Sequence, residues 1–77
     1  MTANERIIEL VNREYLDRIP SFVRKHATER SCKLIEREFP DIYEMFSREN
    51  EPDDEAKRQM SLIVNDIFAE RLARHHL

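Results

Sequence analysis

Thiol and imidazole groups are the side chains here best suited to nucleophilic chemistry, and the sequence holds one cysteine and three histidines. Cys32 and His26 are six residues apart, so an unbroken helix points them about 120° away from one another, too far for a base to activate a nucleophile. His75 and His76 are adjacent and point about 100° apart, unlike the i,i+4 histidine pair of a helical zinc site. We therefore expect neither an enzyme nor a metal or other cofactor site.

The densest group of charges is the acidic stretch at residues 51–55, four carboxylates and a proline. A calcium loop of the EF-hand type needs oxygen ligands at alternating positions, a central glycine and a glutamate at its twelfth position, and this stretch has no such spacing. Acidic residues beside a proline are typical of a helix start, because carboxylates interact favourably with the free N–H groups of a first turn. We predict that Asp53 and Asp54 begin a helix and pair with Lys57 and Arg58 four residues later. An acidic docking patch that overlaps this helix start is the alternative.

Charge is unevenly distributed along the chain, whose formal net charge is -3. Residues 18–37 carry six basic and two acidic side chains, whereas residues 38–55 carry eight acidic side chains and one basic one. On a helix the basic segment can contact phosphates, and the candidate contacts are Arg24, Lys25, Arg30, Lys33 and Arg37. Two glutamates interrupt the segment and Phe22 is its one aromatic residue, so DNA or RNA binding is the alternative function.

The elements that must position these residues are helices. Prolines at positions 20, 40 and 52 divide the chain into four segments, each with apolar residues at helical spacing. Thr2 or Asn4 can cap the first helix, and Ser21 the second. A break between Thr28 and Ser31 is possible, so the second segment is one helix or two. The expected helices cover residues 4–18, 21–38, 40–48 and 52–75.

The last segment has the strongest helical pattern. A helix over residues 52–75 would be roughly 36 Å long and can span a small domain. Its apolar side chains lie on one side, at Ala56, Met60, Ile63, Val64, Ile67, Phe68 and Leu72. The first segment has a similar set, at Ile7, Ile8, Leu10, Val11, Tyr15 and Ile19. The sequence predicts an all-α fold, a small bundle of three to four helices with a long C-terminal helix, forming a single domain over residues 1–77.

A second apolar face on the last helix indicates an interface. Leu62, Ala69 and Ala73 lie opposite its main stripe, near Asn65, and Leu16 is similarly placed on the first helix. Small residues in a row let another helix approach closely. A 77-residue domain buries only about 60% of the surface that its unfolded chain exposes, which favours self-association. We predict that these five residues line an interface with a second copy or a partner protein.

One local resemblance has a bearing on this interface. The run IYEMFSRENEPDDEAKRQMSLIVNDIF, residues 42–68, is similar to the first helix, first loop and long second helix of core histones, with which it shares VNDIF, and LARHH at 72–76 is similar to a histone second-helix ending. The chain departs from histones in its missing third helix and basic tail, and in an acidic stretch where histones are basic. The resemblance implies a paired, intertwined dimer built around residues 52–75.

Composition also bears on location and function. With one cysteine there is no intramolecular disulfide, and the longest apolar run, residues 62–64, resembles neither a signal peptide nor a membrane span. The absence of glycine disfavours phosphate-binding loops.

We expect a cytoplasmic, intracellular protein that works as a non-catalytic protein–protein interaction module, a small regulatory or adaptor protein acting through burial of a helix face. Its partner would be another protein or a second copy, with no membrane and no small-molecule substrate.

Overall fold

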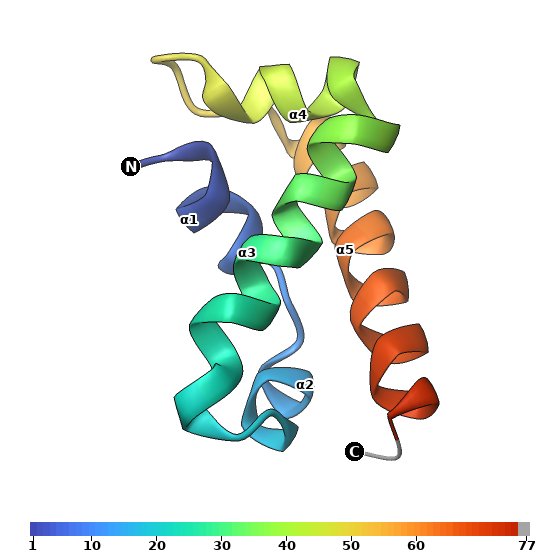
Figure 1. Ribbon diagram of the computed structural model, residues 1–77. Coiled ribbons are helices and arrows are strands. Elements are labelled where there is room, and N and C mark those ends of the chain that lie inside the picture. The colour runs from blue at the N-terminus through green and yellow to red at the C-terminus, as the bar shows by residue number, and fades with distance from the viewer. Residues whose placement is uncertain (76–77) are drawn as a thin grey trace.

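Two long helices, α3 and α5, form the body of the molecule, and three shorter helices complete its core (Figure 1). The computed structural model describes residues 1–75. Helix α4 lies across one end of the two long helices, and α2 lies at the other end (Figure 1). None of the helices within residues 1–75 is both long and apolar enough to cross a bilayer. The bounds are α1 Ala3–Ile8, α2 Arg13–Arg18, α3 Ser21–Glu38, α4 Pro40–Ser47 and α5 Asp54–Arg74.

Side-chain caps begin α1 and α5, close to the helix starts that the sequence predicts at residues 4 and 52. The Thr2 hydroxyl accepts a hydrogen bond from the backbone N–H of Glu5, whose carboxylate accepts one from the N–H of Thr2, so the two residues form a capping box. The Asp53 carboxylate accepts the N–H of Ala56 at 2.9 Å and caps α5. The predicted cap at Ser21 is wrong, because α3 begins at Ser21 itself and has no side-chain cap.

The prediction of one continuous first helix is wrong. The chain leaves the helical conformation between α1 and α2, and Asn12 caps the start of α2. Helix α5 holds this break: the Asn12 N–H donates to Asn65 Oδ1 at 2.6 Å, and Asn65 Nδ2 donates to the Leu10 carbonyl at 3.0 Å. The break lets α1 pack against α3, α4 and α5 while α2 packs against α5. The bundle therefore has five helices within residues 1–75 rather than three or four.

Helix α3 is unbroken, which answers the question that the sequence left open between Thr28 and Ser31. It ends at Glu38 because Pro40 disfavours the helical conformation at the residue before it. That residue, Phe39, has φ -131° and ψ 58° and turns the chain into α4. The proline thus both ends one helix and begins the next.

The buried side of α5 repeats every four residues, at Ala56, Met60, Val64, Phe68 and Leu72. A step of four residues advances about 40° beyond one full turn, so the buried stripe slants around the helix. Along its length α5 therefore meets α4 near its start and α2 near its end (Figure 1). The predicted apolar stripe is confirmed, and Ile63 and Ile67 at its edge are half-buried against the same core.

Exposed ion pairs with an acidic residue four positions before a basic one form at Glu14–Arg18, Glu44–Arg48 and Glu70–Arg74. At the start of α5 the predicted partners are wrong. Lys57 binds Glu51 at 3.0 Å, and the Asp53 carboxylate is engaged as the helix cap instead. Arg58 binds Glu55 at 2.7 Å rather than Asp54. The hydrogen bond to Lys57 lowers the pKa of Glu51, and the one to Arg58 lowers the pKa of Glu55. Exposed pairs of this kind contribute little to stability.

Candidate functional site

A groove lies between α3 and the C-terminal part of α5, and it encloses about 470 Å³. This volume is within the range of ligand-binding clefts. The floor is apolar and combines residues from both long helices with the residue that follows α2. Its apolar lining consists of Ile19, Val23, Ala27, Phe68 and Leu72. Buried core side chains thus continue into an open surface at this end of the molecule.

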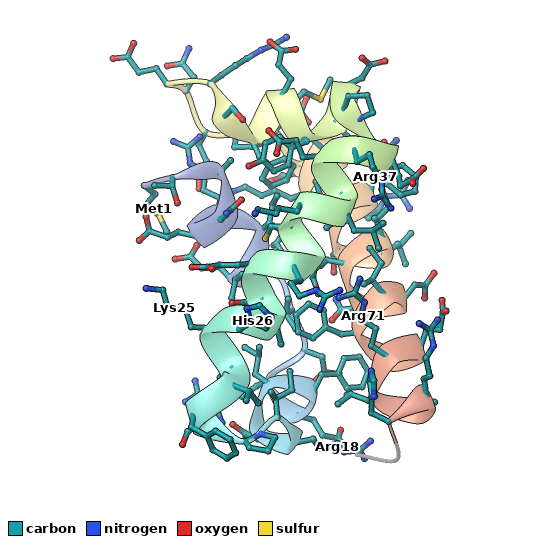
Figure 2. The ribbon with its side chains drawn as sticks, viewed as in Figure 1. Met1, Arg18, Lys25, His26, Arg37 and Arg71 are labelled. Carbon is teal, nitrogen blue, oxygen red and sulfur yellow. The ribbon has the colours of Figure 1, made fainter. Side chains whose placement is uncertain are left out.

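Basic side chains surround this floor: the guanidinium groups of Arg30, Arg71 and Arg74, and the imidazoles of His26 and His75. In the described part of the chain no carboxylate lines the groove. Arg71 is half-buried, and its guanidinium has a long hydrogen bond of 3.5 Å to the Ser31 hydroxyl. Figure 2 shows Arg71 on the α5 side and His26 on the α3 side of this region. Since a guanidinium has five donors, Arg71 retains hydrogen-bonding capacity for an anion.

The five basic residues considered for nucleic-acid contact do not form one surface. Arg30, Lys33 and Arg37 share one side of α3, at spacings of three and four residues. Arg24 is half-buried, and its guanidinium donates at 2.9 Å to the backbone carbonyl just after α2. Lys25 lines a different cavity, between α3 and α1. Only the first three therefore lie together as a surface that could meet phosphates.

The five residues predicted for a protein interface are also divided. Leu62 is 59% exposed and Ala73 is exposed on the same side of α5, with Ala69 half-buried between them. Leu16 is half-buried and packs against the core, and the amide of Asn65 bonds within the chain. The open part of this face is consequently small.

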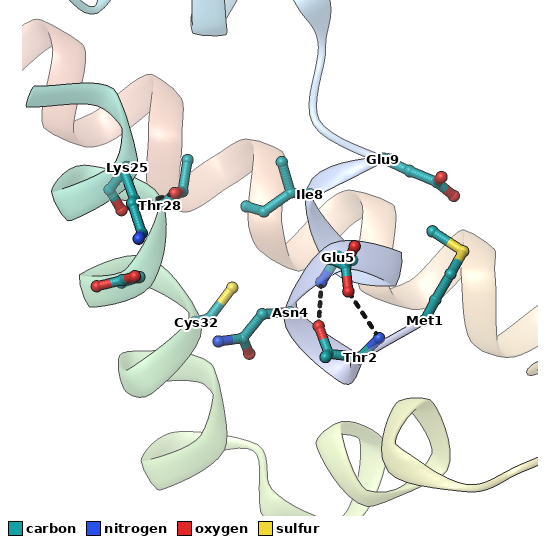
Figure 3. Close-up of a pocket in the computed structure, with 10 residues that line it drawn as sticks. Met1, Thr2, Asn4, Glu5, Ile8, Glu9, Lys25, Thr28 and Cys32 are labelled. Carbon is teal, nitrogen blue, oxygen red and sulfur yellow. Dashed lines mark hydrogen bonds between the residues drawn. The ribbon is translucent and has the colours of Figure 1, made fainter. Parts of the chain in front are cut away.

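A second cavity of about 550 Å³ lies between α1 and α3. Figure 3 shows Cys32 extending from α3 toward it, with the hydrogen bonds between Thr2 and Glu5 on the opposite wall. His26 lines the other groove, so Cys32 and His26 face different cavities, as their spacing predicts. Cys32 is only 1% exposed, and burial raises the pKa of its thiol to about 11.

The burial of Cys32 predicts slow reaction with a thiol reagent. At pH 8 about one thiol in a thousand is ionised when its pKa is about 11, and the thiolate is the reactive species. We expect Ellman's reagent to label folded protein at least about 100-fold more slowly than protein in 6 M urea. A labelling rate in native buffer equal to the rate in urea would contradict the buried placement.

The same pKa shift predicts a pH dependence of stability. The folded state binds the thiol proton more tightly than the unfolded state, so its contribution is full below the unfolded pKa and is lost as pH rises toward about 11. We expect the free energy of unfolding to fall between pH 8 and 10.5, and to fall less in Cys32→Ala. Urea titrations of both proteins at the two pH values measure this difference, and parallel losses would contradict it.

Arg6 organises the acidic segment that follows α4. Its Nη1 donates to the backbone carbonyls of Phe46 at 3.2 Å, Arg48 at 2.7 Å and Asn50 at 3.4 Å, and its Nη2 donates to that of Glu49 at 3.2 Å. One guanidinium from α1 thus satisfies carbonyls at the end of α4 and beyond it.

Within residues 1–75 no three His, Cys, Asp or Glu side chains gather as metal ligands do.

Removing this guanidinium should loosen the segment more than the core. We expect Arg6→Met to lower the free energy of unfolding by about 1–2 kcal/mol, a modest loss because water can reach most of the freed carbonyls. Arg13→Met is the matched control, since Arg13 is exposed. Urea denaturation measures the change, and amide hydrogen exchange at residues 48–53 should speed up only in Arg6→Met. Equal behaviour of the two variants would refute this role of Arg6.

The groove was not predicted from the sequence. Each residue of its floor was assigned to a helix or to the core, but α3 and α5 contact each other only in the folded chain. A partial signal existed: Arg71 and Arg74 flank Leu72 at the end of the apolar stripe. Such a flank is equally typical of the last turn of a helix, where cations interact favourably with free carbonyls.

No protein-family model, no curated protein and no solved structure matches this chain.

Proposed function

We propose that this chain is a non-catalytic protein–protein interaction module, a small cytoplasmic regulatory or adaptor protein that buries part of its surface against another protein. The observation that carries the proposal is the groove between α3 and α5, where Val23 is 38% exposed and Ala27 half-buried beside the buried core residues Phe68 and Leu72. Helix-lined grooves with apolar floors are a common way to bind a helical segment of another protein. The outer face of α5, with Leu62, is a second surface for a partner or a second copy.

Photo-crosslinking tests whether the chain has protein partners at these surfaces. A photoreactive amino acid replaces His26 in the groove, Leu62 on the outer face, or Glu14 on α2 as a control, in the cells that produce the protein. All three positions are exposed, so the replacements preserve the core. Discrete crosslinked proteins at position 26 or 62, and not at 14, are expected. Their absence at both positions would refute the proposal.

Self-association through the outer face of α5 is tested by mass in solution. Light scattering over a concentration and salt series should show a dimer that Leu62→Glu disperses while the monomer stays folded. Gln59→Glu, an exposed change one turn earlier on α5, is the matched control. An unchanged mass in Leu62→Glu would rule out this interface between copies.

Nucleic-acid binding is the second candidate, because Arg30, Lys33 and Arg37 lie along one side of α3 beside the groove that Arg71 enters. Such a row would meet phosphates without reading bases, and its affinity would fall steeply with salt. Titration with a DNA duplex at several salt concentrations tests this function. Each lost cation, as in Lys33→Gln, should reduce the salt slope by about one.

A further inference from the structure

We propose that the groove between α3 and α5 binds an amphipathic, acidic helix of a partner protein. The inference rests on the proposed function and specifies the partner's chemistry. It follows from two features that occur together in the groove. One is the apolar floor, and the other is the set of arginines around it, here called the rim, which are Arg30, Arg71 and Arg74. Neither feature alone selects an acidic amphipathic segment.

The apolar floor would bind apolar side chains of a partner. Val23 is 38% exposed although it is contiguous with Phe68 and Leu72, which are buried in the core. An apolar side chain placed here would cover Val23 and extend the core, which is favourable because apolar surface leaves water. Phosphates of a nucleic acid gain nothing from such a floor, and Phe68, at 2% exposed, offers no ring face for a base to stack on.

The arginines of the rim would bind carboxylates of a partner. Three arginines line the groove, Arg30, Arg71 and Arg74, and within residues 1–75 no acidic side chain lines it. Arg74 is already paired with Glu70 on α5, so Arg30 and Arg71 are the cations that a partner's carboxylates would meet. Arg30 is exposed, and among the contacts within residues 1–75 the Arg71 guanidinium has one long hydrogen bond, to the Ser31 hydroxyl. Arginine binds carboxylates through paired hydrogen bonds, and opposite charges across an interface guide association and orientation. A basic segment would be repelled here.

The length of the groove suits a short helical contact. Its lining runs from Phe68 on α5 to His75 just after the helix, which is about 10 Å at 1.5 Å per residue. That distance is two turns of a bound helix, enough for apolar side chains at i and i+4 to reach the floor. The two flanks of that helix, on either side of its apolar stripe, would place carboxylates toward the arginines on α3 and α5.

Binding is measured by fluorescence anisotropy with the intact chain and a labelled synthetic helix of about 18 residues, with leucines at i, i+4 and i+7, glutamates on the two flanks of this stripe and alanines elsewhere. Two control peptides share its length: one scatters the same leucines and glutamates around the helix, and one replaces glutamate by lysine. We expect micromolar affinity for the acidic amphipathic peptide. Binding at least about tenfold weaker is expected for both controls.

Two neighbouring residues give a matched pair of variants for the floor. Val23 lines the groove, whereas Phe22 does not, although Phe22 is the more exposed at 88%. Val23→Asp should weaken the peptide at least about tenfold, and Phe22→Asp should leave its affinity unchanged. For the rim, Arg30→Glu should weaken binding similarly, while Arg13→Glu on α2 should not. All four positions are exposed, and circular dichroism checks that each variant is folded.

Several results would overturn the proposal. Equal binding of the scattered peptide would mean that charge alone attracts it, and equal binding in Val23→Asp would place it elsewhere. Displacement of the peptide by a DNA duplex, with a steep salt slope, would assign the rim to nucleic acid. A dimer that Val23→Asp disperses would show that a second copy covers the groove.

Failure of this inference is separable from failure of the proposed function. Crosslinked partners at position 26 with no peptide binding would keep the interaction module and reject the acidic helix. Peptide binding with the expected variant pattern, but no crosslinked protein at position 26 or 62, would confirm the chemistry of the groove and reject its use in the cell.

Discussion

Phe46→Ala is expected to lower the free energy of unfolding by about 3–5 kcal/mol. Phe46 is 1% exposed and is the buried side chain of α4, the helix that contacts α1, α3 and α5. Truncation would leave a cavity where these helices meet. The free energy lost is then the transfer of the ring from water plus an additional cost of the cavity itself. A chain of 77 residues has a total stability of roughly 4–12 kcal/mol, so this single change removes a large share of it.

Phe22→Ala provides the matched control, because it makes the same substitution at a residue that is 88% exposed. We expect its free energy of unfolding to stay within about 0.5 kcal/mol of the unmodified chain. Urea denaturation followed by far-ultraviolet circular dichroism measures both variants at one temperature. A loss at Phe22 as large as that at Phe46 would mean that α3 packs differently at its start, and a small loss at Phe46 would mean that α4 is not part of the core.

Asn65→Ala should lower the free energy of unfolding by about 2–3 kcal/mol. The amide of Asn65 accepts the Asn12 N–H and donates to the carbonyls of Leu10 and Ser61. Its orientation is unambiguous, since a backbone N–H requires the oxygen and a carbonyl requires the nitrogen. Alanine cannot replace either contact, and the half-buried carbonyl of Leu10 would lose its partner.

Helix propensity predicts the opposite sign for Asn65→Ala, because alanine favours a helix over asparagine. A measured loss of stability therefore reports the hydrogen bonds from Asn65 on α5 to the segment between α1 and α2. Asp66→Ala, at the exposed neighbouring position, is the control and should change stability by no more than about 0.5 kcal/mol. Amide exchange at Asn12 should speed up only in Asn65→Ala. Unchanged or increased stability in that variant would show that the break is held by other contacts.

Much of the fold could be read from local sequence. Capping by Thr2 and Asp53, the turn before Pro40 and the apolar repeat of α5 depend on residues within a few positions of one another. Propensities, caps and periodicity act at that range, so they determine helix positions before any tertiary contact exists. The same reasoning separates Cys32 from His26 through their spacing on one helix.

The break near Asn12 depended instead on a contact 53 residues away, from Asn65. Apolar spacing over the first segment is compatible with one helix, and only the position of α5 makes two helices with a bridged gap the better arrangement. Asn65 itself was predicted to face a partner, because helical spacing places it beside Leu62 and reveals nothing about which other helix lies nearby.

By itself the sequence determined the helical class, most helix ends and the apolar sides of the helices, since these follow from interactions between residues close along the chain. Only the tertiary structure decided which charges and apolar residues meet. Val23 and Arg30 on α3 lie 41 residues or more from Arg71 on α5, and their common groove exists because the two helices pack together there and leave Val23 partly exposed beside the buried core. Such a surface is a property of helix packing, which no local pattern encodes.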